Sequence, residues 1–344
     1  MQQIQFSTFG QPSVVAQCLE VPYVGSPAAW EVVVAIEAFP INAADLAVLS
    51  GRYGALPQLP SSVGMEAVGK VVQCGEAVKN LVAGDRVVLL ANNNWSEYRR
   101  VPATTVHKVP GDIDPLQLCM LKVNPATAYL MLDSICDLKP GDWVVQTAPL
   151  GSVGRCVIQL ARSKNIRTIN IVRDIAERKQ ILEMGGDVVV EVGPDLAKKA
   201  LQATGGRSAS LAFDAVAGSG TLALADCLLE GGRVVTYGML SGEPCLLTPE
   251  HTIFKNIKLQ GFWLSKVLNR LNLNDRTTLY DSICDQIRAG KLTIAIDSVF
   301  SINCFSDALK RAEQRGRSGK VVVTFDNNFE PSSEHLNRET FGCK

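Results

Sequence analysis

One stretch, residues 142–173, constrains the fold of this chain more than any other. It opens with a short apolar run, 142–148, whose β-branched residues are typical of a buried strand. A turn that contains Gly151 and Gly154 follows, and the turn leads into a segment with apolar residues at helical spacing. A second apolar strand then ends at Arg173. Strand, turn, helix and strand in this order form a βαβ unit, which predicts a parallel sheet.

The glycine turn of this unit has features of a phosphate-binding turn. Glycine lets the backbone come close to a pyrophosphate, and the free N–H groups at a helix start favour an anion. The full fingerprint is G-x-G-x-x-G, but Pro149 takes its first glycine position here, so that only Gly151 and Gly154 remain. Many α/β turns carry two glycines and bind nothing, so the half-motif alone leaves both interpretations open.

The residue after the second strand indicates which dinucleotide would fit. An acidic residue about 20 positions past the glycines would bind the ribose 2′-hydroxyl of NAD. Arg173 stands 19 residues after Gly154 instead, and a guanidinium suits a 2′-phosphate. This predicts NADP(H). The alternative is a solvated arginine at a strand end, and Asp174 follows it directly.

The 344 residues are long enough for two domains. Short strands broken by Gly and Pro predict a partly open β-barrel-like domain over 1–122. Strands that alternate with helices over 123–264 predict a doubly wound parallel sheet of six strands. From 265–344 the chain leaves this sheet, and its last strand, 320–324, returns to the first domain. The polar tail, 327–344, has no assigned function.

Several local elements can also be predicted. A helix begins after Asn42, which serves as its N-cap, and has Asp45 in its first turn. Helices are expected over 176–184 and 278–288. After the fourth strand of the sheet a helix continues through Leu229, and two glycines then lead into the fifth strand.

Composition excludes several classes of function. Lys plus Arg and Asp plus Glu number 34 each, which leaves no basic field for nucleic acid or for a membrane surface. No apolar run has the length of a transmembrane helix. The start resembles neither a signal peptide nor a transit peptide, so we expect a cytoplasmic protein or a processed form. The ten cysteines form no C-x-x-C pair and the three histidines lack metal-ligand spacing, so no metal site is expected.

The whole chain resembles the medium-chain dehydrogenase/reductase superfamily, through the turn over 148–154, the β-rich first domain and the Gly-Lys-Val-Val of 319–322. Within it, the chain is most similar to the mitochondrial 2-enoyl thioester reductases, and next to the quinone oxidoreductases. The segments that carry this similarity are 50–57, 124–129, 170–174 and 261–265. The resemblance implies an α/β fold in which a six-stranded Rossmann sheet accompanies a GroES-like partly open barrel.

The resemblance also implies a zinc-free member of the superfamily. Zinc-dependent relatives use a cysteine and a Gly-His-Glu, whose matching positions here are Asn42 and Gly64-Met65-Glu66. A methionine thioether cannot replace a histidine on zinc at neutral pH. We therefore expect reduction without a metal ion.

The implied reaction is the NADPH-dependent reduction of the C2=C3 double bond of trans-2-enoyl thioesters. A hydride reaches the β-carbon, a proton reaches the α-carbon, and donors must meet the charge that develops on the thioester oxygen. Tyr53 matches the catalytic tyrosine of the family, and a phenol is a proton donor at neutral pH. The alternative for Tyr53 is a loop tyrosine that packs on prolines.

The remaining positions are carried over as cofactor contacts. Asn124 would lie near the nicotinamide ribose, with a helix cap as the alternative. Lys320 would reach cofactor or substrate phosphates, or else be a solvated lysine at a strand start. The segment 262–265 would lie on the nicotinamide side, or else be an apolar strand end. The full predicted set comprises Asn124, Leu150, Gly151, Ser152, Val153, Gly154, Arg173, Asp174, Tyr237, Gly238, Met239, Leu240, Phe262, Trp263, Leu264, Ser265 and Lys320.

The resemblance further implies a homodimer. It leaves open whether the acyl chain is carried by coenzyme A or by acyl carrier protein. Two other functions compete with the enoyl reductase. One is a zinc-free NADPH:quinone oxidoreductase of the same superfamily, and the other is a non-catalytic NADPH-binding redox sensor.

Overall fold

The computed structural model describes residues 1–325, and the chain divides into two compact units. Of the described residues, the first unit comprises 1–123 together with 273–325, and the second comprises 124–272. The second unit therefore extends past the expected boundary at 264 and includes the helix α9 (Leu264–Leu268). The predicted tail, 327–344, lies outside the described residues. No helix among those described is both long enough and apolar enough to cross a membrane.

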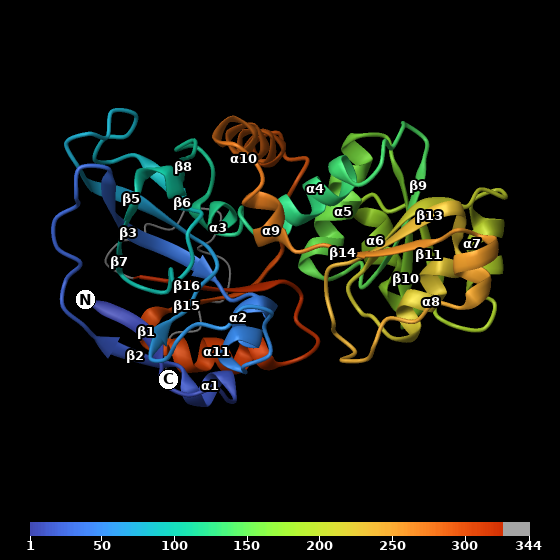
Figure 1. Cartoon of the computed structure of the whole chain (residues 1–344), viewed down its shortest axis with the longest axis horizontal. Coiled ribbons are helices and arrows are strands. Elements are labelled where there is room, and N and C mark those ends of the chain that lie inside the picture. The colour runs from blue at the N-terminus through green and yellow to red at the C-terminus, as the bar shows by residue number, and fades with distance from the viewer. Residues whose placement is uncertain (326–344) are drawn as a thin grey trace. The chain divides into compact units, whose positions relative to one another are not determined.

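The first unit is built on a mixed sheet with the order β15-β16-β3-β5-β6-β8, in which β7 also pairs with β3 (Figure 1). A smaller sheet has the order β2-β1-β4. The predicted return of the last strand is seen in the antiparallel pairing of β16 with β3. The strands are β1 (Gln2–Phe6), β2 (Gln17–Glu20), β3 (Glu31–Pro40), β4 (Ser61–Ser62), β5 (Ala67–Cys74), β6 (Arg86–Leu89), β7 (Tyr98–Pro102), β8 (Val106–Lys108), β15 (Ile296–Ser301) and β16 (Lys320–Thr324).

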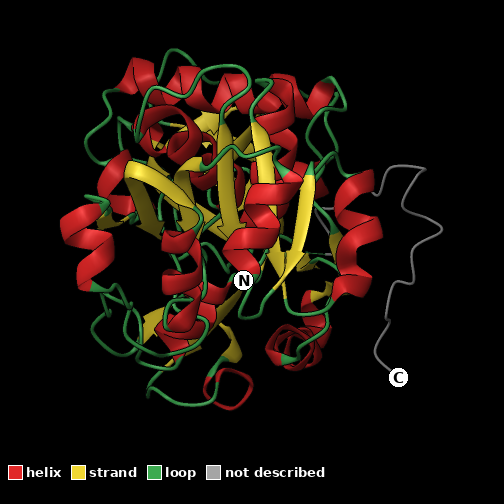
Figure 2. Ribbon diagram, turned by 90° about the vertical axis from the view of Figure 1, so that its right-hand side faces the viewer, coloured by secondary structure: helices red, strands yellow, loops and turns green. Residues whose placement is uncertain are grey.

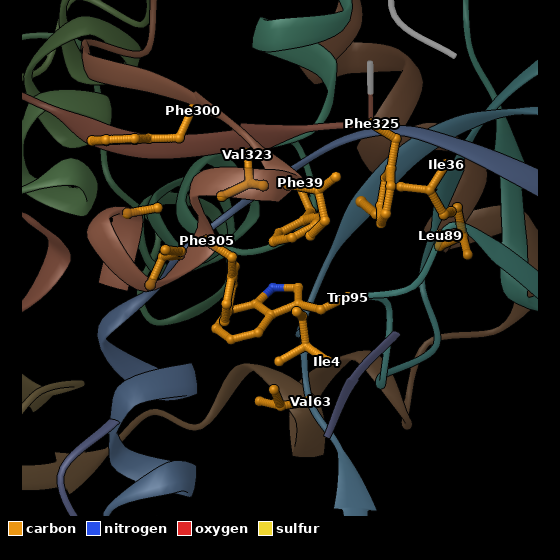
Figure 3. Packing of buried hydrophobic residues seen from close by; sticks show 14 of the residues in the cluster. Ile4, Ile36, Phe39, Val63, Leu89, Trp95, Phe300, Phe305, Val323 and Phe325 are labelled. Carbon is orange, nitrogen blue, oxygen red and sulfur yellow. The ribbon is translucent and has the colours of Figure 1, made fainter. Parts of the chain in front are cut away.

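Aromatic side chains pack together with aliphatic ones in the core of this unit (Figure 3). The ring of Phe39, on β3, stacks on Trp95 with centroids 5.4 Å apart. Trp95 in turn meets Phe305 edge-on at 5.3 Å. These three residues are at most 3% exposed, and aromatic burial of this kind is a large source of stability.

The second unit contains a six-stranded sheet in which all neighbours pair in parallel, in the order β11-β10-β9-β12-β13-β14. The doubly wound sheet predicted from the sequence is confirmed, and helices cover both of its faces (Figure 2). The order reverses between β9 and β12, which is where such sheets bind ligands. The strands are β9 (Trp143–Thr147), β10 (Arg167–Val172), β11 (Val188–Glu191), β12 (Ala209–Asp214), β13 (Leu228–Thr236) and β14 (Lys258–Gly261).

The helices fall close to their predicted positions, with three differences. Helix α8 (Ser219–Asp226) ends before Leu229, and β13 already begins at Leu228, because that buried leucine pairs with Ala209 of β12. The prediction of a helix through Leu229 is therefore wrong. The helix expected over 176–184 is split into η2 (Ile175–Glu177) and α6 (Arg178–Glu183). The helix expected over 278–288 is α10 (Leu273–Arg288), which begins five residues earlier.

The remaining helices have the following bounds. Those of the first unit are α1 (Pro12–Val15), α2 (Ala43–Leu49), η1 (Ala103–Thr105), α3 (Pro115–Leu118), α10 (Leu273–Arg288), η4 (Ile302–Cys304) and α11 (Phe305–Glu313). Those of the second unit, besides α9, are α4 (Asn124–Ser134), α5 (Ser152–Ser163), η2 (Ile175–Glu177), α6 (Arg178–Glu183), α7 (Leu196–Ala203), α8 (Ser219–Asp226) and the π-helical turn η3 (Glu250–Phe254).

Candidate active site

Most of the predicted cofactor residues of the second unit lie at one edge of its sheet. Because all six strands are parallel, their carboxyl ends meet at the same edge. Four predicted segments directly follow the ends of β9, β10, β13 and β14, and the sheet therefore brings them to this edge. These segments are 150–154, 173–174, 237–240 and 262–265. Asn124, by contrast, is the buried first residue of α4.

The glycine turn after β9 has the geometry that close backbone approach requires. A Cβ atom on Gly154 would lie 2.5 Å from the Ala148 carbonyl oxygen, so only glycine lets α5 start this close to the turn. The buried Gln146 amide fixes the helix start by donating to the Gly154 carbonyl at 3.1 Å. Gly151 precedes the helix without a side-chain cap, which leaves N–H groups at the helix start for an anion. The turn therefore fits a dinucleotide pyrophosphate.

Arg173 and Asp174 differ in how far their side chains are engaged. Both are exposed after the end of β10. Asp174 accepts from the Ala176 N–H at 2.9 Å and so caps η2. Arg173 makes no hydrogen bond or ion pair with any residue of the 1–325 range. Its guanidinium is therefore available to an external anion, while the carboxylate beside it stabilises the turn.

The segment after β13 is held against the end of β12. The Tyr237 N–H donates to the Asp214 carbonyl at 3.0 Å, and a Cβ atom on Gly238 would lie 2.6 Å from the Ala215 carbonyl. Burial, together with the negative charge of Asp214, raises the pKa of the Tyr237 phenol, which stays protonated. Met239 and Leu240 are exposed beyond it.

The segment after β14 continues the same edge. The Phe262 N–H donates to the Thr236 carbonyl at 2.8 Å, and its ring is buried. Trp263 is partly buried, and the Lys266 ammonium lies 5.1 Å from the centroid of its indole ring. Leu264 and Ser265 are also only partly exposed and begin α9.

Tyr53 belongs to the first unit and is positioned by α2. As predicted, Asn42 is the N-cap and Asp45 lies in the first turn, where its carboxylate accepts from the Asn42 N–H at 2.8 Å. Gly51 follows the helix at a φ of +71°, a conformation that favours glycine, and turns the chain. Tyr53 then packs, half-buried, against the core of this unit.

Lys320 lies in a buried polar network, and the prediction that it could be a solvated lysine is wrong. Its ammonium donates to the Asn42 side-chain oxygen, and the Asn42 amide donates to Glu66 at 2.8 Å. The second oxygen of Glu66 accepts from the Val123 N–H at 2.8 Å. Lys320 and Glu66 are both at least 94% buried. Its role at a phosphate stays a prediction, since the contact that the structure provides is with Asn42.

Lys122 brings a second cation to the same network. Its ammonium donates to the carbonyl oxygens of Met65 at 2.5 Å and Ala91 at 3.2 Å and to the Asn92 side chain at 3.0 Å. Burial lowers its pKa to about 8, against the attraction of Glu66. Burial likewise raises the pKa of Glu66 and brings that of Asp45 to about 7. The two acidic groups and the two ammonium groups thus compensate each other in a buried site.

Sequence reasoning missed the roles of this network and of a second buried carboxylate, Asp214. Lys122 stands alone among the apolar residues of 118–123, and Asp214 ends an apolar strand, so both signals were present. A charged residue inside an apolar run is buried only if an opposite charge or hydrogen bonds compensate it. Its partners, however, come from distant parts of the chain and cannot be read from one sequence.

Two family models match the chain. The alcohol dehydrogenase GroES-like domain matches residues 28–111, and the zinc-binding dehydrogenase model matches residues 152–278. A mitochondrial enoyl-[acyl-carrier-protein] reductase of Dictyostelium discoideum is 34% identical over 294 residues, which are 83% of each chain. The human mitochondrial enoyl-[acyl-carrier-protein] reductase is also 34% identical, over 83% of this chain and 79% of its own.

The chain belongs to the enoyl-[acyl-carrier-protein] reductase family of the medium-chain dehydrogenases/reductases. The resemblance seen in the sequence is confirmed. Among solved structures, the mitochondrial 2-enoyl thioester reductase heterodimer of Candida tropicalis is similar with a TM-score of 0.84 and 25% identity, over 94% of this chain and 99% of that one. A Bacillus thuringiensis protein described provisionally as an NADPH:quinone reductase is similar with a TM-score of 0.87 and 26% identity, over 94% and 98%.

A zinc site needs a cluster of ligands, and the described residues of this chain do not form one. Among residues 1–325, no group of three or more His, Cys, Asp or Glu side chains lies together in a way that could hold a metal ion. At the matching positions, Asn42 and both oxygens of Glu66 are bonded within the network, and the Lys320 ammonium would repel a cation.

Proposed function

We propose that this enzyme reduces the C2=C3 double bond of trans-2-enoyl thioesters with NADPH. The observation that carries the proposal is the 34% identity to enoyl-[acyl-carrier-protein] reductases over 83% of the chain. The sheet edge of the second unit supports it, because a glycine turn, a helix start and an exposed Arg173 occur there together.

Different residues of the chain would bind the cofactor and donate the proton in this reaction. NADPH, when bound, supplies the hydride that the β-carbon receives. The turn over 150–154 would hold the pyrophosphate, Arg173 the 2′-phosphate, and Asn124 and the segments 237–240 and 262–265 the nicotinamide end. Tyr53 would donate a hydrogen bond to the thioester oxygen as charge develops there, or a proton to the α-carbon. The product is the saturated thioester.

We infer that the reaction proceeds without zinc. The support is that Asn42 and Glu66, which stand at positions matching the zinc site of zinc-dependent relatives, are both bonded within the buried network. Elemental analysis of the purified enzyme should find less than one zinc ion per ten chains, with full activity after treatment with a chelator. Loss of activity on chelation would refute this part of the proposal.

The decisive assay compares initial rates of NADPH oxidation with a trans-2-enoyl-CoA and with a simple quinone. The proposal expects rapid turnover of the enoyl thioester and slow turnover of the quinone. The opposite result would favour a quinone reductase. The similarity to the B. thuringiensis protein supports this alternative. NADPH binding without turnover of either substrate would favour a redox sensor. The same assay with enoyl-loaded acyl carrier protein decides between the two carriers.

Replacing Arg173 with alanine should weaken NADPH binding 10-fold to 100-fold and change NADH binding less than twofold. The reason is that a charge-assisted hydrogen bond contributes about 1.5–3 kcal/mol, and only NADPH has the 2′-phosphate. Dissociation constants from nicotinamide fluorescence titrations measure the effect. Arg207→Ala is the matched control, because this exposed arginine precedes β12 at the opposite edge of the sheet. Equal losses for both cofactors would contradict the assignment.

We further propose a homodimer joined through β14, which ends the six-stranded sheet. An unpaired strand edge binds another strand readily, and Leu259 on β14 is exposed together with the nearby Ile253 and Phe254. Analytical ultracentrifugation should give twice the chain mass. Leu259→Lys should shift the enzyme to monomers, since like charges would meet across the two-fold axis. Leu201 on α7 is similarly exposed, and the control variant Leu201→Lys should remain dimeric. A monomeric unmodified enzyme would refute the proposal.

The compartment is a separate question. The relatives are named as mitochondrial, and the cytoplasmic location predicted from the sequence stays a prediction. Subcellular fractionation of the organism, followed by detection of the enzyme with a specific antibody, answers it directly.

A further inference from the structure

A buried carboxylate joins the ends of β9 and β12, and none of the assignments above uses it. Asp214 is fully buried and forms no ion pair with any residue in the described part of the chain. Its Oδ1 accepts from the Thr147 hydroxyl at 3.1 Å and from the N–H groups of Val216 at 2.9 Å and Ala217 at 3.0 Å. Its Oδ2 accepts from the Thr221 hydroxyl at 2.6 Å. Four donors thus satisfy a charge that would otherwise be costly to bury.

These bonds lie where the strand order of the sheet reverses. Thr147 ends β9 and leads into the glycine turn, and its hydroxyl also accepts from the Ala215 N–H at 3.0 Å. The backbone carbonyl of Asp214 accepts from the Tyr237 N–H at 3.0 Å. Asp214 therefore forms hydrogen bonds with the end of β9, with the turn that follows β12 and with the turn that follows β13.

Two of these turns hold alanines in an unfavourable conformation. Ala148 has a φ of +48° and Ala217 a φ of +66°, in the left-handed region that residues with a side chain rarely adopt. Such a conformation persists only where its surroundings fix it, and it is concentrated at functional sites. Ala148 directly follows Thr147, and the Ala217 N–H is itself bonded to Asp214.

We propose that Asp214 is a positioning residue, which acts through Thr147 to hold the pyrophosphate turn in its binding conformation. The inference rests on the proposed NADPH site at this edge and extends it to two residues that need not touch the cofactor. Because the pyrophosphate is common to both dinucleotides, Asp214 supports NADPH and NADH alike. This separates its role from that of Arg173.

The test is cofactor binding by the full-length enzyme without substrate. Asp214→Asn keeps the shape of the side chain but removes its charge and turns one oxygen into an amide group. The dissociation constants of NADPH and NADH should both rise about tenfold, or about 1.4 kcal/mol, with their ratio unchanged. Thr147→Val leaves the carboxylate in place and should act in the same direction. In the double variant the dissociation constants should rise by less than the product of the two single increases, because both changes break the same hydrogen-bond network.

Thr204→Val is the matched control. Its buried hydroxyl lies 2.5 Å from the carbonyl oxygen of Arg207, to which it donates, and 3.0 Å from that of Leu201. Thr204 precedes β12 at the other edge of the sheet. It should lower the melting temperature as much as Thr147→Val and leave cofactor binding unchanged.

The outcomes separate this inference from the proposed function. An unmodified enzyme that binds neither dinucleotide overturns the proposed function. An unmodified enzyme that binds NADPH, with Thr147→Val and Asp214→Asn variants that bind equally well, overturns the inference alone. If Asp214→Asn does not fold, Thr147→Val decides by itself. A loss confined to NADPH would also contradict the proposal.

Discussion

Replacing Tyr53 with phenylalanine should lower kcat for trans-2-enoyl-CoA reduction by about 100-fold or more, the contribution typical of a positioned general acid. The change removes one oxygen and leaves the ring that packs against the core of the first unit. The unfolding transition and the dissociation constant of NADPH should therefore stay nearly unchanged. Steady-state rates, thermal unfolding and fluorescence titration measure the three quantities on the same preparation.

Tyr23→Phe is the control for this prediction. Tyr23 lies in the same unit, is exposed, and meets Tyr98 edge-on at 5.2 Å, so it shares the chemistry of Tyr53 but belongs to no proposed site. Its removal should leave the rate within twofold of the unmodified enzyme. If Tyr53→Phe also keeps the full rate, the tyrosine is structural and the α-carbon receives its proton from another donor. If it abolishes NADPH binding, its role is in cofactor binding.

The order of the elements could be predicted from the sequence because their signals are local. The apolar strand, the two glycines and the helical spacing after Gly154 all lie within one 32-residue stretch, 142–173. The cap at Asn42 is likewise set by residues three positions apart, and the structure has it. Errors occurred where a distant partner decides, as at Leu228, which joins β13 because Ala209 pairs with it.

Some residues of the candidate site could likewise be proposed from local sequence, whereas others depend on distant partners. The glycine turn and Arg173 could be proposed from the sequence because each is marked by local residues, and their roles at the cofactor stay predictions. Lys320 was assigned from the family resemblance alone, and its contact with Asn42 joins residues 278 positions apart. The same holds for Thr147 and Asp214, whose bond spans 67 positions. Networks of buried charge therefore required the structure.

Replacing Lys122 with methionine should destabilise the enzyme by about 3 kcal/mol or more, because removing one partner of a buried ionic network leaves the others uncompensated. Its ammonium donates hydrogen bonds to the Met65 and Ala91 carbonyl oxygens and to the Asn92 side chain. Its positive charge also compensates the negative charges of Glu66 and Asp45. The free energy of unfolding from urea denaturation measures the loss. Lys70→Met is the matched control: this lysine on β5 is 43% exposed, and losing its contact with Glu37 should cost less than about 1 kcal/mol.

The pH dependence of the same variant gives a second, independent check. Burial lowers the pKa of Lys122 to about 8, whereas an unfolded lysine titrates near 10.4, so between these values the unfolded chain binds more protons than the folded one. The contribution of Lys122 to stability therefore rises with pH from about 8 to about 10. The stability difference between the unmodified enzyme and Lys122→Met should widen across this window. A difference that stays constant from pH 7 to 10 would mean that Lys122 remains charged throughout.

A double variant, Lys122→Met with Glu66→Gln, tests the coupling of the two residues. Its loss of stability should be smaller than the sum of the losses of the two single variants, since each change removes the other residue's partner. Additive losses would mean that Glu66 is compensated by Lys320 alone.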